Sequence, residues 1–396
     1  MKTVCVRNMP FVQEAFETLG ETTLLEGRSI TADDVRDADL MAIRSTTKVD
    51  ATLLEGSKVR FVGTATIGTD HLDIDYLERN NIRWCFSPGC NANSVSEYLV
   101  TALLCLANRH GFQLRGKTLG VIGVGNVGKR VVDKAKALGL NVLQNDPPRQ
   151  RTEADTNTFV DLDTLLDNSD IVTTHVPITR EGPDATYHMA DAEFFNRMRL
   201  GSIFINAARG PVAETNALLD MIASRHLAHV VLDTWEGEPQ FNPDLLKAVD
   251  IGTPHIAGHS FEGKVTGTVM VYQDACRMLG VAPTWTPDAL LPPPDVPEVI
   301  LDATGLSEED ALWNIVHQVY DIEGDDTRMR SPLQSAPPRA YPAGSKDATD
   351  LSSHFDSLRK NYPIRREFRF TTVNLHNATD ALHETFTQLG FNVHSV

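Results

Sequence analysis

Hydrophobic residues recur along the first 93 residues in short runs, separated by helical or polar stretches. Such alternation is typical of a parallel sheet in an α/β domain. We therefore predict a doubly wound α/β domain in this part of the chain. Strands are expected at residues 2–6, 24–25, 40–43, 61–62 and 84–86, and a helix at residues 11–19.

A second α/β series follows a helix at residues 92–108 that is apolar on nearly all sides. A helix so apolar is buried or lies between domains. We predict a complete doubly wound domain over residues 94–255. A helix at residues 261–279 then returns to the first domain, which would comprise residues 1–93 and 256–285. Strands of the second domain are expected at residues 118–122, 141–146, 171–174, 202–206, 229–233 and 250–252.

The composition changes beyond residue 281, where prolines form a stiff linker. A unit as small as residues 286–396 usually needs a partner surface to bury its core. We therefore predict a small α+β domain that joins two copies of the chain into a homodimer. Helices are expected at residues 308–320 and 378–389, strands at 367–373 and 391–394, and a mobile segment at 330–350.

Residues 118–148 join a buried strand to an amphipathic helix through a G-x-G-x-x-G turn. In such a turn Gly123 permits the tight bend, and Gly125 lets the backbone approach a pyrophosphate. Gly128 lets helix and strand pack closely. The N–H groups at the start of the helix would face the pyrophosphate. The turn therefore predicts a dinucleotide cofactor.

Asp146 ends the next strand, where a carboxylate binds ribose hydroxyls and repels a 2′-phosphate. This favours NAD over NADP, although Arg149 and Arg151 follow closely. The alternative for Asp146 is a solvated loop acid before two prolines.

Three further strands end in residues suited to redox chemistry on a 2-hydroxy acid. Arg209 ends NAARG, Glu238 lies in LDTWEGEP and His255 in TPHIAG. All three should lie at the carboxyl edge of the sheet, beside the nicotinamide. The arginine can hold the substrate carboxylate, the imidazole can take the hydroxyl proton, and the carboxylate can orient the imidazole. Taken singly, they could be a surface ion pair, a solvated acid and a capped loop histidine, but together they favour catalysis.

Charge and cysteine content narrow the possible partners. A formal net charge of −17 argues against nucleic acid and anionic membranes, which need basic patches. The five cysteines are odd in number and show no C-x-x-C, so we expect neither disulfides nor a metal site. No signal-peptide or membrane-spanning run is evident, and a cytoplasmic protein is expected.

On these motifs the sequence resembles the D-2-hydroxyacid dehydrogenase superfamily, whose catalytic arginine, glutamate and histidine match Arg209, Glu238 and His255. RSTTKVD, FVGTATIGTDHLD, IGTPHIAGHSFEGK and HFDSLRKNYPIRREF resemble the branch that oxidises 4-phospho-D-erythronate in pyridoxal 5′-phosphate synthesis. The resemblance covers essentially the whole chain. It implies a flavodoxin-like substrate domain, a Rossmann NAD domain and a C-terminal dimerisation domain.

The same resemblance implies which residues bind ligands. Ser45 and Thr66 are expected to contact substrate, and His259 stands where the family commonly has a substrate-contacting tyrosine. Val176 stands where close relatives often carry threonine near the cofactor. The residues expected to contact NAD are Gly123, Gly125, Asn126, Val127, Gly128, Asp146, Val176, Ala207, Ala208, Asp233 and Gly258.

A phosphorylated substrate needs cations that this acidic chain does not offer broadly. We expect one from Arg44 or Lys48, and others from Arg359, Arg365 or Arg366 in the tail of a second copy. Two alternatives remain. One is another 2-hydroxy acid dehydrogenase, acting for example on 3-phosphoglycerate, and the other is an NAD-sensing protein without enzymatic activity.

Overall fold

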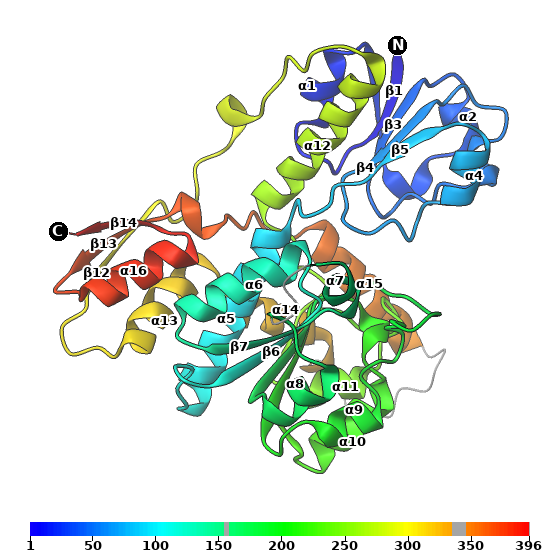
Figure 1. The fold of residues 1–396 in the computed structure, drawn as a ribbon. Coiled ribbons are helices and arrows are strands. Elements are labelled where there is room, and N and C mark those ends of the chain that lie inside the picture. The colour runs from blue at the N-terminus through cyan, green and yellow to red at the C-terminus, as the bar shows by residue number, and fades with distance from the viewer. Residues whose placement is uncertain (154–157, 335–345, 396) are drawn as a thin grey trace. The chain divides into compact units, whose positions relative to one another are not determined.

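The computed structural model describes residues 1–153, 158–334 and 346–395, which form two compact units (Figure 1). The first unit comprises Met1–Asn93 with His259–Pro293, and the second comprises Ser94–Gly258 with Pro294–Val396. The strands pair in parallel throughout the three sheets, so the predicted α/β class is confirmed.

The first unit is built on a five-stranded sheet in the order β2-β1-β3-β4-β5. The reversal of strand order beside β1 is the doubly wound pattern, and the loops after β3 and β4 share one edge. Helix α12 packs against β4 and α1. The strands are β1 (Lys2–Val6), β2 (Glu21–Leu25), β3 (Leu40–Ile43), β4 (Phe61–Thr64) and β5 (Arg83–Cys85), and the helices are α1 (Val12–Glu17), α2 (Ala32–Val35), α3 (Ala51–Leu54), α4 (Ile74–Arg79) and α12 (Phe261–Leu279).

The second unit contains a six-stranded sheet in the order β11-β10-β9-β8-β6-β7. The chain runs outward from β6 to β7 and then returns to β8, so the topological switch point lies between β6 and β8. In open α/β sheets this is where ligands bind. The strands are β6 (Thr118–Ile122), β7 (Asn141–Asn145), β8 (Ile171–Thr174), β9 (Ser202–Asn206), β10 (Leu227–Leu232) and β11 (Ile251–Gly252), and the helices are α5 (Ala92–His110), α6 (Asn126–Ala137), α7 (Pro147–Thr152), α8 (Leu162–Asn168), α9 (Ala192–Arg197), α10 (Thr215–Ala223) and α11 (Pro243–Ala248).

The C-terminal region belongs to the second unit and carries a sheet of its own, in the order β12-β13-β14. Helix α16 packs against α6, and α14 packs against β11, so this region shares packing with the six-stranded sheet. The separate third domain stays a prediction. The strands are β12 (Glu298–Asp302), β13 (Thr372–His376) and β14 (Asn392–Ser395), and the helices are α13 (Glu308–Val319), α14 (Ile322–Gln334), α15 (Lys346–Lys360) and α16 (Asp380–Leu389).

One expectation for this region was wrong. The strand expected at residues 367–373 begins at Thr372, because Phe368–Phe370 form a 3-10 turn. From that turn the ring of Phe368 stacks on Phe391, with ring centroids 4.5 Å apart, and fills the core. The segment at residues 330–350 was expected to be mobile. It is helical up to residue 334 and from residue 346, its remainder lies outside the described residues, and its mobility stays a prediction.

A half-buried histidine in the first unit has a lowered pKa. The Nε2 atom of His71 lies 2.9 Å from the hydroxyl of Thr64 at the end of β4. Burial lowers the pKa of His71 to about 4, against a smaller opposing effect of Asp70. His71 therefore takes up a proton near pH 6.5 in the unfolded chain, but only at a lower pH in the folded protein.

We expect the free energy of unfolding to fall as the pH drops from about 6.5 to about 4, because the unfolded state then binds more protons. In His71→Gln the slope of stability against pH in this window should be smaller than in the parent protein. Urea unfolding at several pH values measures this slope. His394→Gln, which changes an exposed histidine, is the control and should keep the parent slope. An unaltered slope in His71→Gln would contradict the prediction.

Candidate active site

The glycine turn between β6 and α6 has the form that a bound dinucleotide requires. Gly123 has a φ of 84°, and a side chain there would lie 2.7 Å from the carbonyl oxygen of His175. A side chain on Gly128 would lie 2.1 Å from the carbonyl oxygen of Gly123, so helix and turn are in contact. A side chain on Gly125 would meet no atom of the described chain within 4 Å. The backbone is open on that side, as the approach of a pyrophosphate demands.

Asp146 follows β7 beside this turn and is held against it. Its carboxylate accepts a hydrogen bond from a backbone N–H of the turn at 2.8 Å and another from the N–H of Arg149 at 3.1 Å. The guanidinium of Arg149 is paired with Glu153, and that of Arg151 with Asp184. Both arginines that could favour a 2′-phosphate therefore already have carboxylate partners. The arrangement fits NAD.

Arg209 lies in a tight turn after β9. The side chain of Asn206 fixes this turn, because its Nδ2 donates to the carbonyl of Arg209 and its Oδ1 accepts from the N–H of Ala208, both at 3.0 Å. Gly210 brings the turn against the loop after β10, since a side chain on Gly210 would lie 2.0 Å from the carbonyl of Trp235. The two loops that carry the arginine and the glutamate therefore touch through their backbones.

The loop after β10 carries two glutamates with different partners. The carboxylate of Glu238 bonds to Nδ1 of His255 and accepts the N–H of Trp235 at 3.0 Å. Glu236 bonds instead to Nε2 of His188. Burial disfavours the charged form of Glu238, but the imidazole of His255, the N–H of Trp235 and the charge of Arg359 together outweigh it, so the pKa of this carboxyl lies below its ordinary value. Glu238 is thus a charged partner for the histidine.

The loop that carries His255 is held by a buried carboxylate. His255 has a φ of 55°, a left-handed conformation that costs about 1 kcal/mol for a residue with a side chain. Asp233 is 1% exposed and accepts the N–H groups of Ile256 and Ala257 at 2.7 and 2.9 Å, and the hydroxyl of Thr253 at 2.7 Å. Burial raises the pKa of Asp233, and these donors offset only part of that effect. A direct contact of Asp233 with NAD stays a prediction.

The other residues expected to bind NAD also lie at strand ends of the second unit. A side chain on Gly123 would meet Val176 at 2.7 Å, so the loop after β8 lies against the glycine turn. Asn126 and Val127 begin α6, Ala207 and Ala208 follow β9, and Gly258 ends the histidine loop.

The residues expected to bind substrate lie in the first unit. Ser45 follows β3 and is exposed, and Thr66 follows β4 with its hydroxyl donating to the carbonyl of Gly68 at 2.9 Å. His259 precedes Ser260, the N-cap of α12. Their contact with substrate stays a prediction.

Two tail arginines expected to reach a second copy are bound within their own chain. Arg365 is 7% exposed, and its guanidinium donates to the carbonyl of Ala257 at 2.5 Å and lies 4.2 Å from the ring centroid of Tyr320. Arg366 is 6% exposed and lies over the ring of Phe370. The expectation that these two residues bind the phosphate of a neighbouring copy was wrong, because both are buried within their own chain.

One group of side chains in the part of the chain that the structure describes could hold a metal ion. It comprises His110, His229 and Asp250, whose potential ligand atoms lie within 4.8 Å of one another. His229 and Asp250 lie toward the amino ends of β10 and β11, away from the loops that carry Glu238 and His255. Asp250 accepts from Nδ1 of His229 at 2.9 Å and from the N–H of Val230. Both oxygens of its carboxylate therefore have hydrogen-bond partners within the chain.

The chain is similar to a known family of NAD-binding domains and to named enzymes over nearly its full length. Residues 105–257 match the family described as D-isomer specific 2-hydroxyacid dehydrogenase, NAD binding domain, and residues 290–390 match a domain of unknown function. The chain is 43% identical over 390 residues to erythronate-4-phosphate dehydrogenase of Azotobacter vinelandii, covering 98% of this chain and 99% of the relative. It is 41% identical over 392 residues to the Escherichia fergusonii enzyme of that name, covering 99% and 98%.

Solved structures share the fold. A cofactor-bound 3-phosphoglycerate dehydrogenase of Entamoeba histolytica aligns with a TM-score of 0.61 at 24% identity, covering 71% of this chain and 95% of that one. A D-lactate dehydrogenase of Aquifex aeolicus, complexed with NAD and lactic acid, aligns with a TM-score of 0.59 at 25% identity, covering 70% and 95%. Separately, none of the helices within the described residues has the length and hydrophobicity to cross a bilayer.

We expect Gly210→Ala to lower kcat by at least about tenfold and the free energy of unfolding by about 1–3 kcal/mol, because the added methyl group has no room against the buried Trp235 loop. Steady-state kinetics and urea unfolding measure both. Gly305→Ala is the control, since its site is open but has a φ of 74°. That variant should lose stability through the backbone alone and keep its kcat. Full activity in Gly210→Ala would show that the arginine and glutamate loops need not touch.

Proposed function

The chain belongs to the erythronate-4-phosphate dehydrogenase family, and we propose that it oxidises 4-phospho-D-erythronate at C2 to (R)-3-hydroxy-2-oxo-4-phosphooxybutanoate, a step of pyridoxal 5′-phosphate synthesis. The observation that carries the proposal is the hydrogen-bonded pair of Glu238 and His255. Glu238 and His255 lie in loops that follow β10 and β11. These loops are at the same carboxyl edge of the sheet as Arg209, which follows β9, and the glycine turn, which follows β6.

Bound NAD supplies the acceptor for the hydride that leaves C2. Nδ1 of His255 is engaged with Glu238, so Nε2 is the nitrogen that takes the proton of the C2 hydroxyl. The negative charge of Glu238 stabilises the imidazolium that forms. Arg209 holds the substrate carboxylate and polarises the oxygen at C2, where charge develops as the proton leaves.

Two arginines are candidates for the substrate phosphate. The charge of Arg359 contributes to the lowered pKa of Glu238, so this cation acts near the catalytic pair of its own chain. Arg44 directly follows β3. Lys48 is a weaker candidate, because its ammonium group is paired with Asp50 at 2.8 Å. We propose Ser45, Thr66 and His259 as further substrate contacts.

We also propose that the chain forms a homodimer through residues 286–396. β12 is an edge strand of the three-stranded sheet, and its Ile300 is 66% exposed. Leu306, shortly after that strand, is 38% exposed. An edge strand with exposed apolar side chains is suited to a second copy of the same surface.

All five cysteines lie in the described ranges and form no disulfide there, which supports a reducing compartment such as the cytoplasm.

Turnover of 4-phospho-D-erythronate, 3-phosphoglycerate and D-glycerate with NAD tests the substrate. We expect kcat/KM for 4-phospho-D-erythronate to exceed the others by roughly 100-fold, because a site built around a charged group strongly rejects analogues that lack it or place it elsewhere. Preference for 3-phosphoglycerate would instead support the other dehydrogenase. Binding of NAD without turnover of any of the three would support the NAD-sensing alternative.

The two glutamates of the DTWEGEP segment provide a matched pair of variants. Glu238→Gln should lower kcat by roughly 100-fold, the lower end of what a positioned acid–base group contributes, while the dissociation constant of NAD stays within about twofold. Glu236→Gln, two positions away and bonded to another histidine, should keep kcat within about threefold. Equal losses of kcat in both variants would contradict the proposal that Glu238 orients His255 and stabilises its imidazolium.

A further inference from the structure

Helix α14 of the C-terminal region supplies a hydrogen-bond acceptor to the strand that leads to the catalytic histidine. Among the described strands, β11 lies at the edge of its sheet, so its outer side has no neighbouring strand. Oδ1 of Asp326 accepts the N–H of Gly252 at 2.7 Å, and both residues are buried. Gly252 ends β11, three residues before His255. An unpaired N–H at such a buried position would be destabilising, because it would lose its hydrogen bonds to water without replacement.

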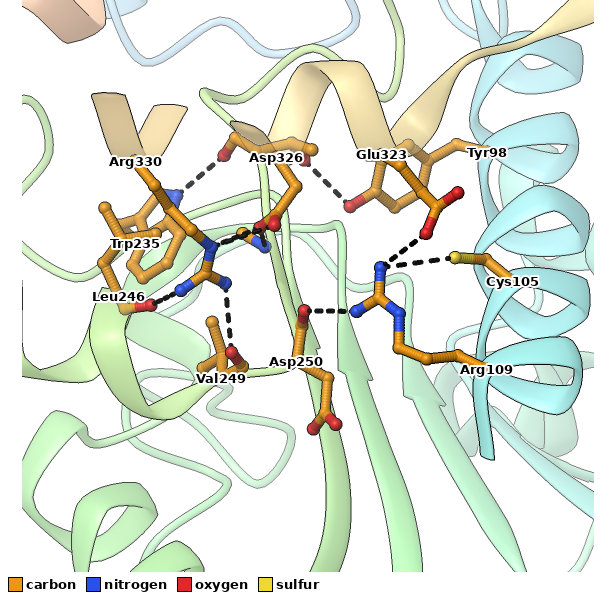
Figure 2. Close-up of polar contacts among 12 residues, drawn as sticks. Tyr98, Cys105, Arg109, Trp235, Leu246, Val249, Asp250, Glu323, Asp326 and Arg330 are labelled. Atoms are coloured by element: carbon orange, nitrogen blue, oxygen red, sulfur yellow. Dashed lines mark hydrogen bonds and ion pairs between the residues drawn. The ribbon is translucent and has the colours of Figure 1, made fainter. Parts of the chain in front are cut away.

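Arg330 holds Asp326 in place and extends the contact to the end of α11 (Figure 2). Its Nε lies 2.8 and 2.9 Å from the two carboxylate oxygens of Asp326. Its terminal nitrogens donate to the carbonyls of Leu246 and Val249, which end α11. Arg330 on α14 therefore binds both the carbonyls just before β11 and Asp326, which is the acceptor for the N–H of Gly252 in β11.

The segment anchored in this way also carries the partner of the histidine. The carbonyl of Thr253, next to Gly252, accepts the indole N–H of Trp235 at 2.8 Å. The backbone N–H of the same tryptophan donates to Glu238. A displacement of the end of β11 would therefore move both members of the pair of Glu238 and His255.

Arg365 holds the other end of the histidine loop. Its guanidinium donates to the carbonyl of Ala257, two residues after His255, and to the hydroxyl of Ser94. The ring of Tyr320 packs beneath it. Residues of the C-terminal region thus bind the loop in front of the histidine and behind it, within one chain.

We propose that the C-terminal region, which matches a domain of unknown function, positions the catalytic histidine of its own chain. Asp326, held by Arg330, and Arg365 are positioning residues that keep His255 in its left-handed conformation and in line with Glu238. Proton transfer tolerates little displacement, since an error of about 1 Å can cost about 100-fold in rate. The inference rests on the proposed function in one respect, the proton transfer by His255.

The test compares three variants of the full chain, with rates normalised to the concentration of NAD-binding sites. Asp326→Ala should lower kcat at least about tenfold while the dissociation constant of NAD stays within about twofold, because the glycine turn lies on other strands. Asp326→Asn should retain most of kcat, since its amide oxygen can still accept the N–H of Gly252. Arg328→Ala is the control, because Arg328 pairs with Asp325 on the same helix and should leave kcat unchanged.

A double-mutant cycle separates positioning from general support of the fold. In a Glu238→Gln background, Asp326→Ala should lower kcat by less than about threefold, because the contact through which Asp326 acts is already weakened. An equal loss in both backgrounds, or a folded Asp326→Ala with full kcat, would overturn the inference. If Asp326→Ala does not fold, Arg330→Gln and Arg365→Lys replace it with the same expected outcomes.

Proton NMR gives a readout that needs no substrate. The hydrogen bond between His255 and Glu238 should produce a far-downfield imidazole proton in the NAD complex, absent in Glu238→Gln. Asp326→Ala should weaken or shift this resonance, and Arg328→Ala should not. The same resonance in Asp326→Ala as in the parent protein would contradict positioning. Failure of the parent protein to oxidise 4-phospho-D-erythronate would overturn the proposed function and leave this result standing.

Discussion

A buried carboxylate organises the catalytic edge of this protein. Asp233 is almost inaccessible to solvent, and an isolated charge in such a place would be strongly unfavourable. It is stabilised by backbone N–H groups from the histidine loop and by the hydroxyl of Thr253. Because removing any one donor leaves a buried charge poorly satisfied, this set of bonds favours one geometry of the loop. The left-handed conformation of His255, and with it the bond to Glu238, follows from that geometry.

The same loop receives bonds from a distant part of the chain. Asp326 and Arg365 lie in the C-terminal region, and both bind backbone groups near the histidine. The region that we propose to join two copies is therefore also packed against the histidine loop of its own chain. In the proposed homodimer, a change at the contact surface would have a physical route to the histidine through α14.

The three glycines and the strand-end residues were recognisable from short stretches of sequence. Each depends on a local pattern, namely a strand, a turn and a polar residue at the carboxyl edge, and parallel strands bring such edges together. Helix α14 was missed because its sequence is polar and contains Pro332, so no amphipathic period marks it. The burial of Arg365 was missed for a related reason, since a run of arginines in a tail normally indicates a solvated surface.

The sequence by itself determined the α/β class, the dinucleotide turn and the preference for NAD, and it predicted the three residues proposed for catalysis, because residue spacing along single strands and turns encodes each of them. Only the tertiary structure decided that Glu236 bonds to His188, that Asp326 accepts the N–H of Gly252 and that Arg365 is bound within its own chain. Those partners are far apart in sequence: Asp326 and Gly252 are separated by 74 residues, and Arg365 and Ala257 by 108. Contacts of that range depend on how helices pack against the sheet, which no local pattern specifies.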